Sequence, residues 1–78
     1  MNNKELIEFV LTLPNMKVKY FPRFKTYAFS MKNGGRYING WAVLDHVKFF
    51  FETMKKQKFE HKNFSYYIMK NELRIYNM

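Results

Sequence analysis

The stretch from Trp41 to Lys58 (WAVLDHVKFFFETMKKQK) constrains the fold of this chain most, because its apolar residues recur three and four positions apart. This spacing is typical of an amphipathic helix whose apolar stripe faces a core. Asn39 and Gly40 supply a helix start, since an Asn side chain can accept a hydrogen bond from a free N–H group of the first turn. The residues expected on the stripe are Val43, Val47, Phe50 and Met54, with Leu44 and Phe51 on the adjoining row.

One aromatic residue of this helix does not follow the stripe. At about 100° per residue, Phe49 projects opposite the stripe centre, among Asp45, Thr53 and Lys56. Single exposed rings are common on soluble proteins and need no explanation. The alternative is that Phe49, Thr53 and Lys56 contact a protein partner, and self-association through Phe49 is one form of this contact.

The N-terminal part of the chain predicts a helix followed by a hairpin. Asn2 and Glu5 resemble a capping box, and Pro14 ends the helical pattern. Two runs of alternating apolar and polar residues then flank Pro22-Arg23. A turn centred on these two residues would pair Val18 with Tyr27, so that the apolar residues of both strands share one face.

The C-terminal part predicts further strands. Asn33-Gly34-Gly35 is a strong turn signal, because Asn and Gly tolerate the positive φ of tight turns. Arg36-Tyr37-Ile38 is then expected to form a short third strand. After the helix and a polar connector, two strands flank Asn71-Glu72. This turn would pair Ile68 with Ile75 on the core face and Tyr67 with Tyr76 on the other face.

The predicted order of elements is α-β-β-(β)-α-β-β in a single domain, residues 1–78. It predicts an α+β fold with an antiparallel sheet of four to five strands, two helices on one face and the other face open. Cysteine is absent, which excludes disulfides and thiolate metal sites. The N-terminal apolar run carries Glu5 and Glu8 and is too short for a signal peptide or a membrane span, so we expect a cytoplasmic protein without membrane contact.

The net charge of +8 is unevenly distributed. No acidic residue lies between Glu8 and Asp45, and this segment contains six basic ones: Lys17, Lys19, Arg23, Lys25, Lys32 and Arg36. Such a surface can serve solubility alone. It can also bind a polyanion or an acidic protein, because a field of one sign attracts partners of the opposite sign.

Aromatic residues are more numerous than a small core can easily hide, at 21% of the chain. Rings and cations on an open sheet face suit single-stranded nucleic acid, because bases stack on rings while Lys and Arg neutralise phosphates. Alternatively, these side chains are ordinary neighbours on a solvated sheet, or a partner chain covers them. The candidate nucleic-acid-binding residues are Lys17, Lys19, Phe21, Arg23, Phe24, Lys32, Arg36, Tyr67, Arg74 and Tyr76.

Signals for catalysis are weak. Two histidines, His46 and His61, are too few for a metal site at regular ligand spacing, and no cofactor motif is present. Acid–base cleavage of RNA by His61 with a nearby lysine or tyrosine is conceivable, but an ordinary loop histidine is the simpler interpretation. Ser30 and Ser65 lie in no nucleophile motif.

The sequence therefore favours a small, non-catalytic protein that binds nucleic acid, with RNA or single strands preferred to duplex DNA. The alternative is a small inhibitor or adaptor, of the kind carried by phages or mobile elements, that binds an acidic surface of a host protein. Both interpretations use the same charges. They differ in that nucleic-acid binding falls steeply with salt and depends on exposed rings, whereas a protein contact centres on a few anchor residues.

Overall fold

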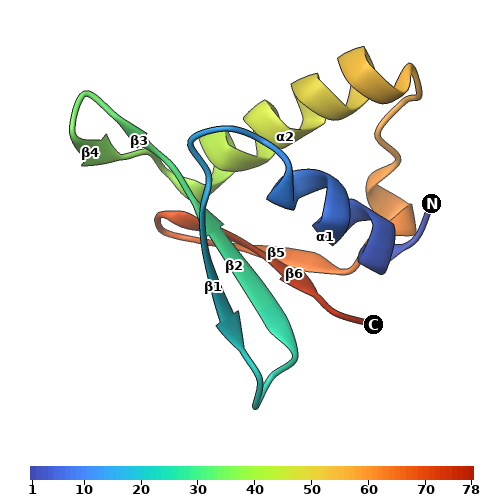
Figure 1. Cartoon of the computed structure of the whole chain (residues 1–78), viewed down its shortest axis with the longest axis horizontal. Helices are drawn as coiled ribbons and strands as arrows, with labels where there is room; N and C mark the ends of the chain where they lie inside the picture. Colours follow the sequence, from blue (N-terminus) through green and yellow to red (C-terminus); the bar gives the residue numbers. More distant parts are fainter.

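The computed structural model describes residues 1–78 and confirms the α+β fold (Figure 1). Two helices lie on one face of a four-stranded antiparallel sheet, and a separate two-stranded ribbon stands apart from it. The main sheet has the order β1-β2-β6-β5, and the ribbon pairs β3 with β4. The elements are α1 (Asn3–Leu11), β1 (Lys17–Phe21), β2 (Thr26–Ser30), β3 (Lys32–Asn33), β4 (Arg36–Tyr37), α2 (Gly40–Lys55), the short 3₁₀ helix η1 (His61–Asn63), β5 (Tyr66–Met69) and β6 (Glu72–Tyr76).

Both helices begin where the sequence predicts. The Asn2 side chain accepts a hydrogen bond of 3.0 Å from the backbone N–H of Glu5, and Asn39 accepts one of 2.8 Å from Ala42. The end of α2 differs from the prediction, because the helix stops at Lys55 rather than Lys58. Lys56 adopts a left-handed conformation with φ of 54°, which turns the chain out of the helix.

The apolar stripe of α2 is rotated from its predicted phase. Val43 and Val47 are fully buried as expected, whereas Phe50 is only half-buried and Met54 is 60% exposed. The most buried ring of α2 is instead that of Phe51, which meets the Phe9 ring of α1 edge to face at 5.7 Å. The chain after α2 folds back on the same side, since the Phe59 ring lies 5.4 Å from that of Phe51. Phe49 is exposed, as predicted.

The two long hairpins have the predicted faces but not the predicted registers. In the first, Val18 pairs with Phe29 rather than Tyr27, because the turn spans residues 22–25 instead of two residues. In the second, Ile68 pairs with Leu73 and Tyr67 with Arg74, because the turn is at Lys70-Asn71. Each shift is an even number of residues, so the residues that remain in these strands keep their predicted face. Phe24 and Lys32, predicted on the open face, lie instead in the turn and in the ribbon.

The burial of β1 is lower than its pattern suggests. Val18 and Tyr20 face the helix side of the sheet, yet they are 45% and 44% exposed. The β1–β2 hairpin extends beyond both helices, so nothing covers this part of the strand (Figure 1). The predicted third strand also lies outside the main sheet, because β4 pairs only with β3.

Asn3 ties the first helix to the C-terminal hairpin. Its buried side chain donates to the backbone oxygens of Ser65 and Tyr76 at 2.8 and 2.7 Å, and accepts from the Ser65 N–H at 3.0 Å. All polar atoms of this amide have partners within the protein. The bonds close the end of the sheet where β6 finishes, and this fixes the position of Tyr76.

Gly40 places the start of α2 directly against the turn of the β5–β6 hairpin. Its N–H donates to the Lys70 oxygen at 2.9 Å. A Cβ atom added at this position would lie 2.3 Å from the Met69 oxygen and 2.6 Å from the Glu72 oxygen. Both are backbone atoms held in the sheet, so only glycine permits this approach.

We expect Gly40→Ala to destabilise the protein by about 1–3 kcal/mol, as overpacked cores do. At an ordinary helical position the same change stabilises by about 1 kcal/mol, so the sign of the effect distinguishes the two situations. Urea denaturation measures it, with Thr53→Ala at an exposed position of the same helix as the control. Equal or greater stability of Gly40→Ala would show that the helix and hairpin do not meet this closely.

Candidate functional site

We call the face of the sheet that points away from the helices the outer face. In each strand, every second side chain points to it. The surface is recessed along β2, because Thr26 and Ala28 are small and are buried between larger neighbours. Longer side chains from β1, β5 and β6 surround them. Register places the following residues on this face: Lys17, Lys19, Phe21, Thr26, Ala28, Ser30, Tyr67, Met69, Glu72, Arg74 and Tyr76.

Three rings form what we call the ring platform of the outer face, namely Phe21, Tyr67 and Tyr76. The Tyr67 and Tyr76 rings lie 5.4 Å apart between centroids and are tilted by 39°. They are diagonal neighbours, which corrects the predicted direct pairing, because Arg74 is the residue opposite Tyr67. The Arg74 guanidinium lies 4.8 Å from the centre of the Phe21 ring and 5.8 Å from that of the Tyr67 ring.

Arg74 is therefore engaged within the protein rather than free for a phosphate. Its Nε and Nη2 donate to Glu72 Oε1 at 3.0 and 2.8 Å, and its Nη1 donates to the Tyr67 hydroxyl at 3.2 Å. The hydrogen bonds to Tyr67 and then Glu72 raise the pKa of Arg74. The ring platform is thus aromatic and close to neutral in charge.

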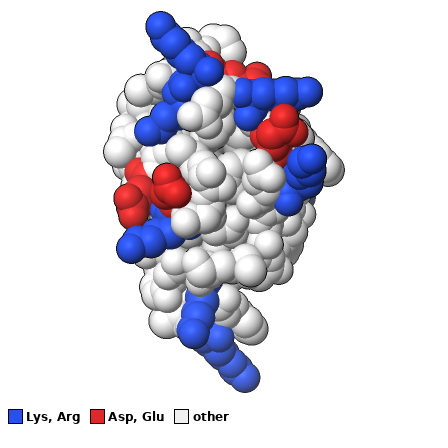
Figure 2. Space-filling model, turned by 90° about the vertical axis from the view of Figure 1, so that its right-hand side faces the viewer, with Lys and Arg blue, Asp and Glu red and all other residues white.

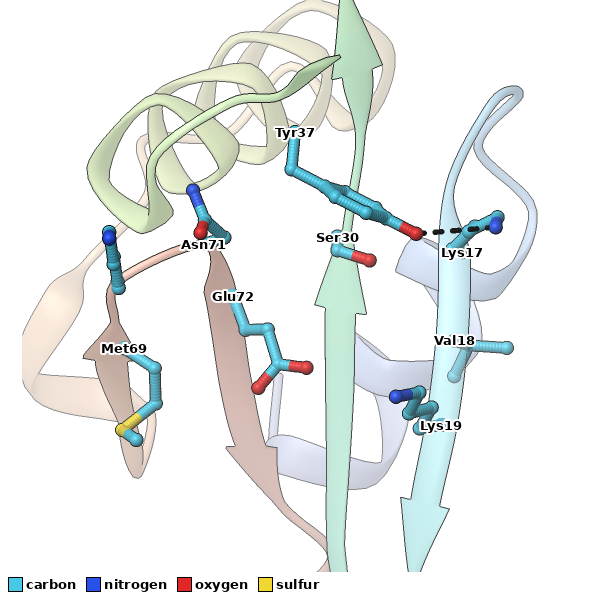
Figure 3. Close-up of a pocket in the computed structure, with 9 residues that line it drawn as sticks. Lys17, Val18, Lys19, Ser30, Tyr37, Met69, Asn71 and Glu72 are labelled. Carbon is cyan, nitrogen blue, oxygen red and sulfur yellow. Dashed lines mark hydrogen bonds between the residues drawn. The ribbon is translucent and has the colours of Figure 1, made fainter. Parts of the chain in front are cut away.

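The cations gather at one end of the outer face, around a groove of about 660 Å³. This volume is within the range of pockets that hold small organic ligands, about 300–1,000 Å³. Lys17 and Lys19 form one wall, and Met69 and Glu72 lie on the opposite side (Figure 3). The lining residues are Lys17, Val18, Lys19, Ser30, Tyr37, Met69, Lys70, Asn71 and Glu72.

Tyr37 of the β3–β4 ribbon covers the upper end of the groove and points its hydroxyl toward Lys17 (Figure 3). Lys17 Nζ donates to that hydroxyl at 3.3 Å, and Lys32 Nζ lies 4.9 Å from the ring centre. The Lys17 hydrogen bond, with the charges of Lys17, Lys32 and Lys19, lowers the pKa of Tyr37. An anionic ligand in the groove would meet these same ammonium groups.

The remaining candidate residues for nucleic acid lie beside the outer face rather than on it. Arg23 and Phe24 are in the β1–β2 turn, with the guanidinium 5.9 Å from the ring centre. Phe24 and Tyr76 both line a smaller hollow of about 400 Å³ at the platform end. Lys32 and Arg36 belong to the ribbon and are exposed, and Lys32 contacts the Tyr37 ring that borders the groove.

The residues predicted to contact a protein partner lie in the helix layer, on the side of the sheet opposite the outer face. Phe49, Thr53 and Lys56 are all exposed on α2, with Phe49 at 62%. Phe49 meets the half-buried Phe50 ring edge to face at 5.4 Å, and the His46 ring lies 4.7 Å from Phe50. These residues share no surface with the ring platform.

His61 lies away from the groove lysines. Its Nδ1 is hydrogen-bonded to the hydroxyl of Tyr66, a residue whose side chain is on the helix side of the sheet. Burial raises the pKa of Tyr66. No three His, Asp or Glu side chains stand close enough together to hold a metal ion. No helix is long and apolar enough to cross a lipid bilayer.

Charge elsewhere on the surface is mixed in sign. On the side that carries both termini and the end of α2, acidic side chains lie close to basic ones and uncharged atoms fill the middle (Figure 2). The groove differs, since its only acidic residue, Glu72, is already paired with Arg74. Three lysines, Lys17, Lys19 and Lys70, therefore line the groove without an unpaired acidic residue beside them.

Sequence reasoning missed seven groove residues: Val18, Ser30, Tyr37, Met69, Lys70, Asn71 and Glu72. A signal for Tyr37 was present, because a two-residue Gly34-Gly35 loop pairs Asn33 with Arg36 and Lys32 with Tyr37. No local signal indicates that this ribbon stands next to Lys17. The turn residues Lys70 and Asn71 join the groove only because the C-terminal hairpin pairs with β2.

No protein-family model, curated protein or solved structure matches this chain.

We expect Tyr37 to ionise at a lower pH than Tyr66, because the Lys17 ammonium favours the phenolate while burial opposes it at Tyr66. Tyrosinate absorbance during a pH titration would show this, and Tyr37→Phe should remove an early component. Lys17→Gln should raise the pKa of Tyr37, whereas Lys25→Gln at the far turn should not. Identical titrations of the two lysine variants would contradict the contact between Lys17 and Tyr37.

Proposed function

We propose that this protein is a non-catalytic binding protein for single-stranded nucleic acid, with RNA favoured, and that its outer face is the binding surface. The observation that supports this most is the order of side chains along the face. Cations and a groove lie at one end, and a ring platform lies at the other. A single strand offers phosphates and unpaired bases together, so it can use both parts at once.

The dimensions of the face suit a short segment of a strand. Glu72 borders the groove and Tyr76 belongs to the ring platform, and they are the two ends of β6. Five residues of a strand span about 14 Å at about 3.4 Å per step. Stacked nucleotides advance by about 3.4 Å each, so about four of them cover this distance, and fewer do so if the strand is extended.

The chemistry of the face favours binding over reaction. Neither histidine lies on it, and its one carboxylate, Glu72, accepts both hydrogen bonds from Arg74. The lysines of the groove provide positive charge, and the platform provides flat apolar surface. These groups stabilise a bound polyanion and offer no evident proton acceptor for its cleavage.

Tyr76→Ala should weaken binding of a short single-stranded RNA by about 1–3 kcal/mol, the usual cost of losing one stacked base. The melting temperature should change little, because this ring is partly exposed on the outer face. Tyr20→Ala is a matched control, since Tyr20 is a similarly exposed tyrosine on the opposite face of the same sheet. Fluorescence anisotropy and thermal melts measure the two effects. Equal losses of affinity for both variants would remove the ring platform from the proposal.

Charge reversal at Lys17 and Lys19 should reduce binding across all sequences. Each lost phosphate contact should also flatten the salt dependence of log K by about 0.7 on a single strand. The control is the double reversal of Lys58 and Lys62, two exposed residues of the connector after α2. If the slope stayed unchanged for the Lys17 and Lys19 variant, the groove would serve an acidic protein rather than nucleic acid.

A further inference from the structure

The outward side of α2 presents an apolar surface that no element of the chain covers. We call it the α2 patch and define it by His46, Phe49 and Phe50. Phe49 is 62% exposed, and Phe50 and His46 are partly buried rings in mutual contact. The outer face does not use the patch, because it lies on the other side of the molecule.

Two charges beside the α2 patch have no partner in the chain. The single ion pair of the protein joins Arg74 to Glu72, so Asp45 and Lys56 are both unpaired and exposed. At about 100° per residue, Asp45 lies about 40° from Phe49 around the helix axis. Asp45 is toward the start of α2, and Lys56 immediately follows its end.

This arrangement is complementary to itself under a two-fold rotation. Two antiparallel copies of α2 that cross near residues 50 and 51 place position 45 of one copy opposite position 56 of the other. The same rotation brings His46 opposite a residue near Met54, and it stacks the Phe49 and Phe50 rings at the centre. Antiparallel helices also align their dipoles favourably. A parallel arrangement would instead place Asp45 opposite Asp45.

We propose that the α2 patch is the interface of a symmetric homodimer, formed by antiparallel packing of α2 against α2 of a second copy. Phe49 and Phe50 form its apolar centre, and two Asp45–Lys56 ion pairs flank it. The contact is isologous, so it closes at two copies. It leaves both outer faces free on opposite sides of a sheet-helix-helix-sheet assembly. If the proposed function holds, each dimer therefore carries two nucleic-acid sites.

Sedimentation equilibrium over a concentration series that extends into the millimolar range tests the dimer. The native protein should dimerise, and Phe49→Ala should weaken the dimer by about tenfold or more, as loss of an aromatic anchor does. Trp41→Ala is the control, because Trp41 is equally exposed on the same helix but lies beyond the end of the partner's α2. Circular dichroism melts check that each variant is folded.

A charge exchange tests the geometry. Asp45→Lys alone and Lys56→Glu alone each put like charges together twice in the homodimer, and each should weaken it by about tenfold. An equimolar mixture of the two variants restores both attractive pairs, so it should form a heterodimer as stable as the native dimer. A parallel or unrelated interface gives no such recovery.

A protein that stays monomeric throughout the series would overturn the proposal, and so would a mixture that associates no better than its components. Neither result bears on the outer face. RNA binding that remains sensitive to Tyr76→Ala in the monomeric Phe49→Ala variant would show that the proposed function holds without the dimer. A dimer that forms but does not bind RNA would show that the dimer exists and the proposed function is wrong.

Discussion

The close contact between Gly40 and the turn of the β5–β6 hairpin organises the rest of the structure. It holds the start of α2 against backbone oxygens of Met69, Lys70 and Glu72, and the Asn71 side chain adds a hydrogen bond of 3.2 Å to the Ile38 oxygen. With this end fixed, the apolar side of α2 lies over β6 and β2. The same turn forms a wall of the groove, so the packing of the core and the shape of the candidate site depend on one contact.

A second attachment, made by Asn3, holds the other end of that hairpin. Between them, the two contacts fix β6 at both of its ends, at the groove and at the ring platform. The strand that links the groove to the ring platform is therefore anchored at both ends. A backbone that is already held in place loses little conformational entropy when a ligand binds, which favours affinity.

The contacts of Arg74 explain why one part of the outer face suits stacking and another part suits phosphate binding. A free arginine in the middle of the sheet would place a phosphate there. Instead, Glu72 neutralises its charge, and its planar group lies against the Phe21 and Tyr67 rings. The ring platform is consequently suited to stacking, while the lysines near Tyr37 attract phosphates. The α2 patch on the opposite layer is independent of both.

Much of the fold follows from local patterns. The Asn side chains at positions 2 and 39 mark both helix starts, and the exposed position of Phe49 follows from helical periodicity. Alternation of apolar and polar residues assigns each strand residue to its face, which is why Lys17, Lys19, Tyr67 and Tyr76 were correctly expected on one side of the sheet. The pattern cannot distinguish registers that differ by two residues, however, because both place every side chain on the same face.

Only the tertiary structure determined which residues from different elements are neighbours. The four-residue β1–β2 turn and the Lys70-Asn71 turn set the registers, and these made Arg74, not Tyr76, the partner of Tyr67. The packing of α1 and Phe59 around Phe51 set the phase of α2 and left Met54 exposed. The pairing of β2 with β6 and the position of the ribbon built the groove and brought Tyr37 to Lys17. These contacts join residues far apart in the chain, so a local pattern of residue types determines the elements and their faces, and only the packing of the whole chain determines the site.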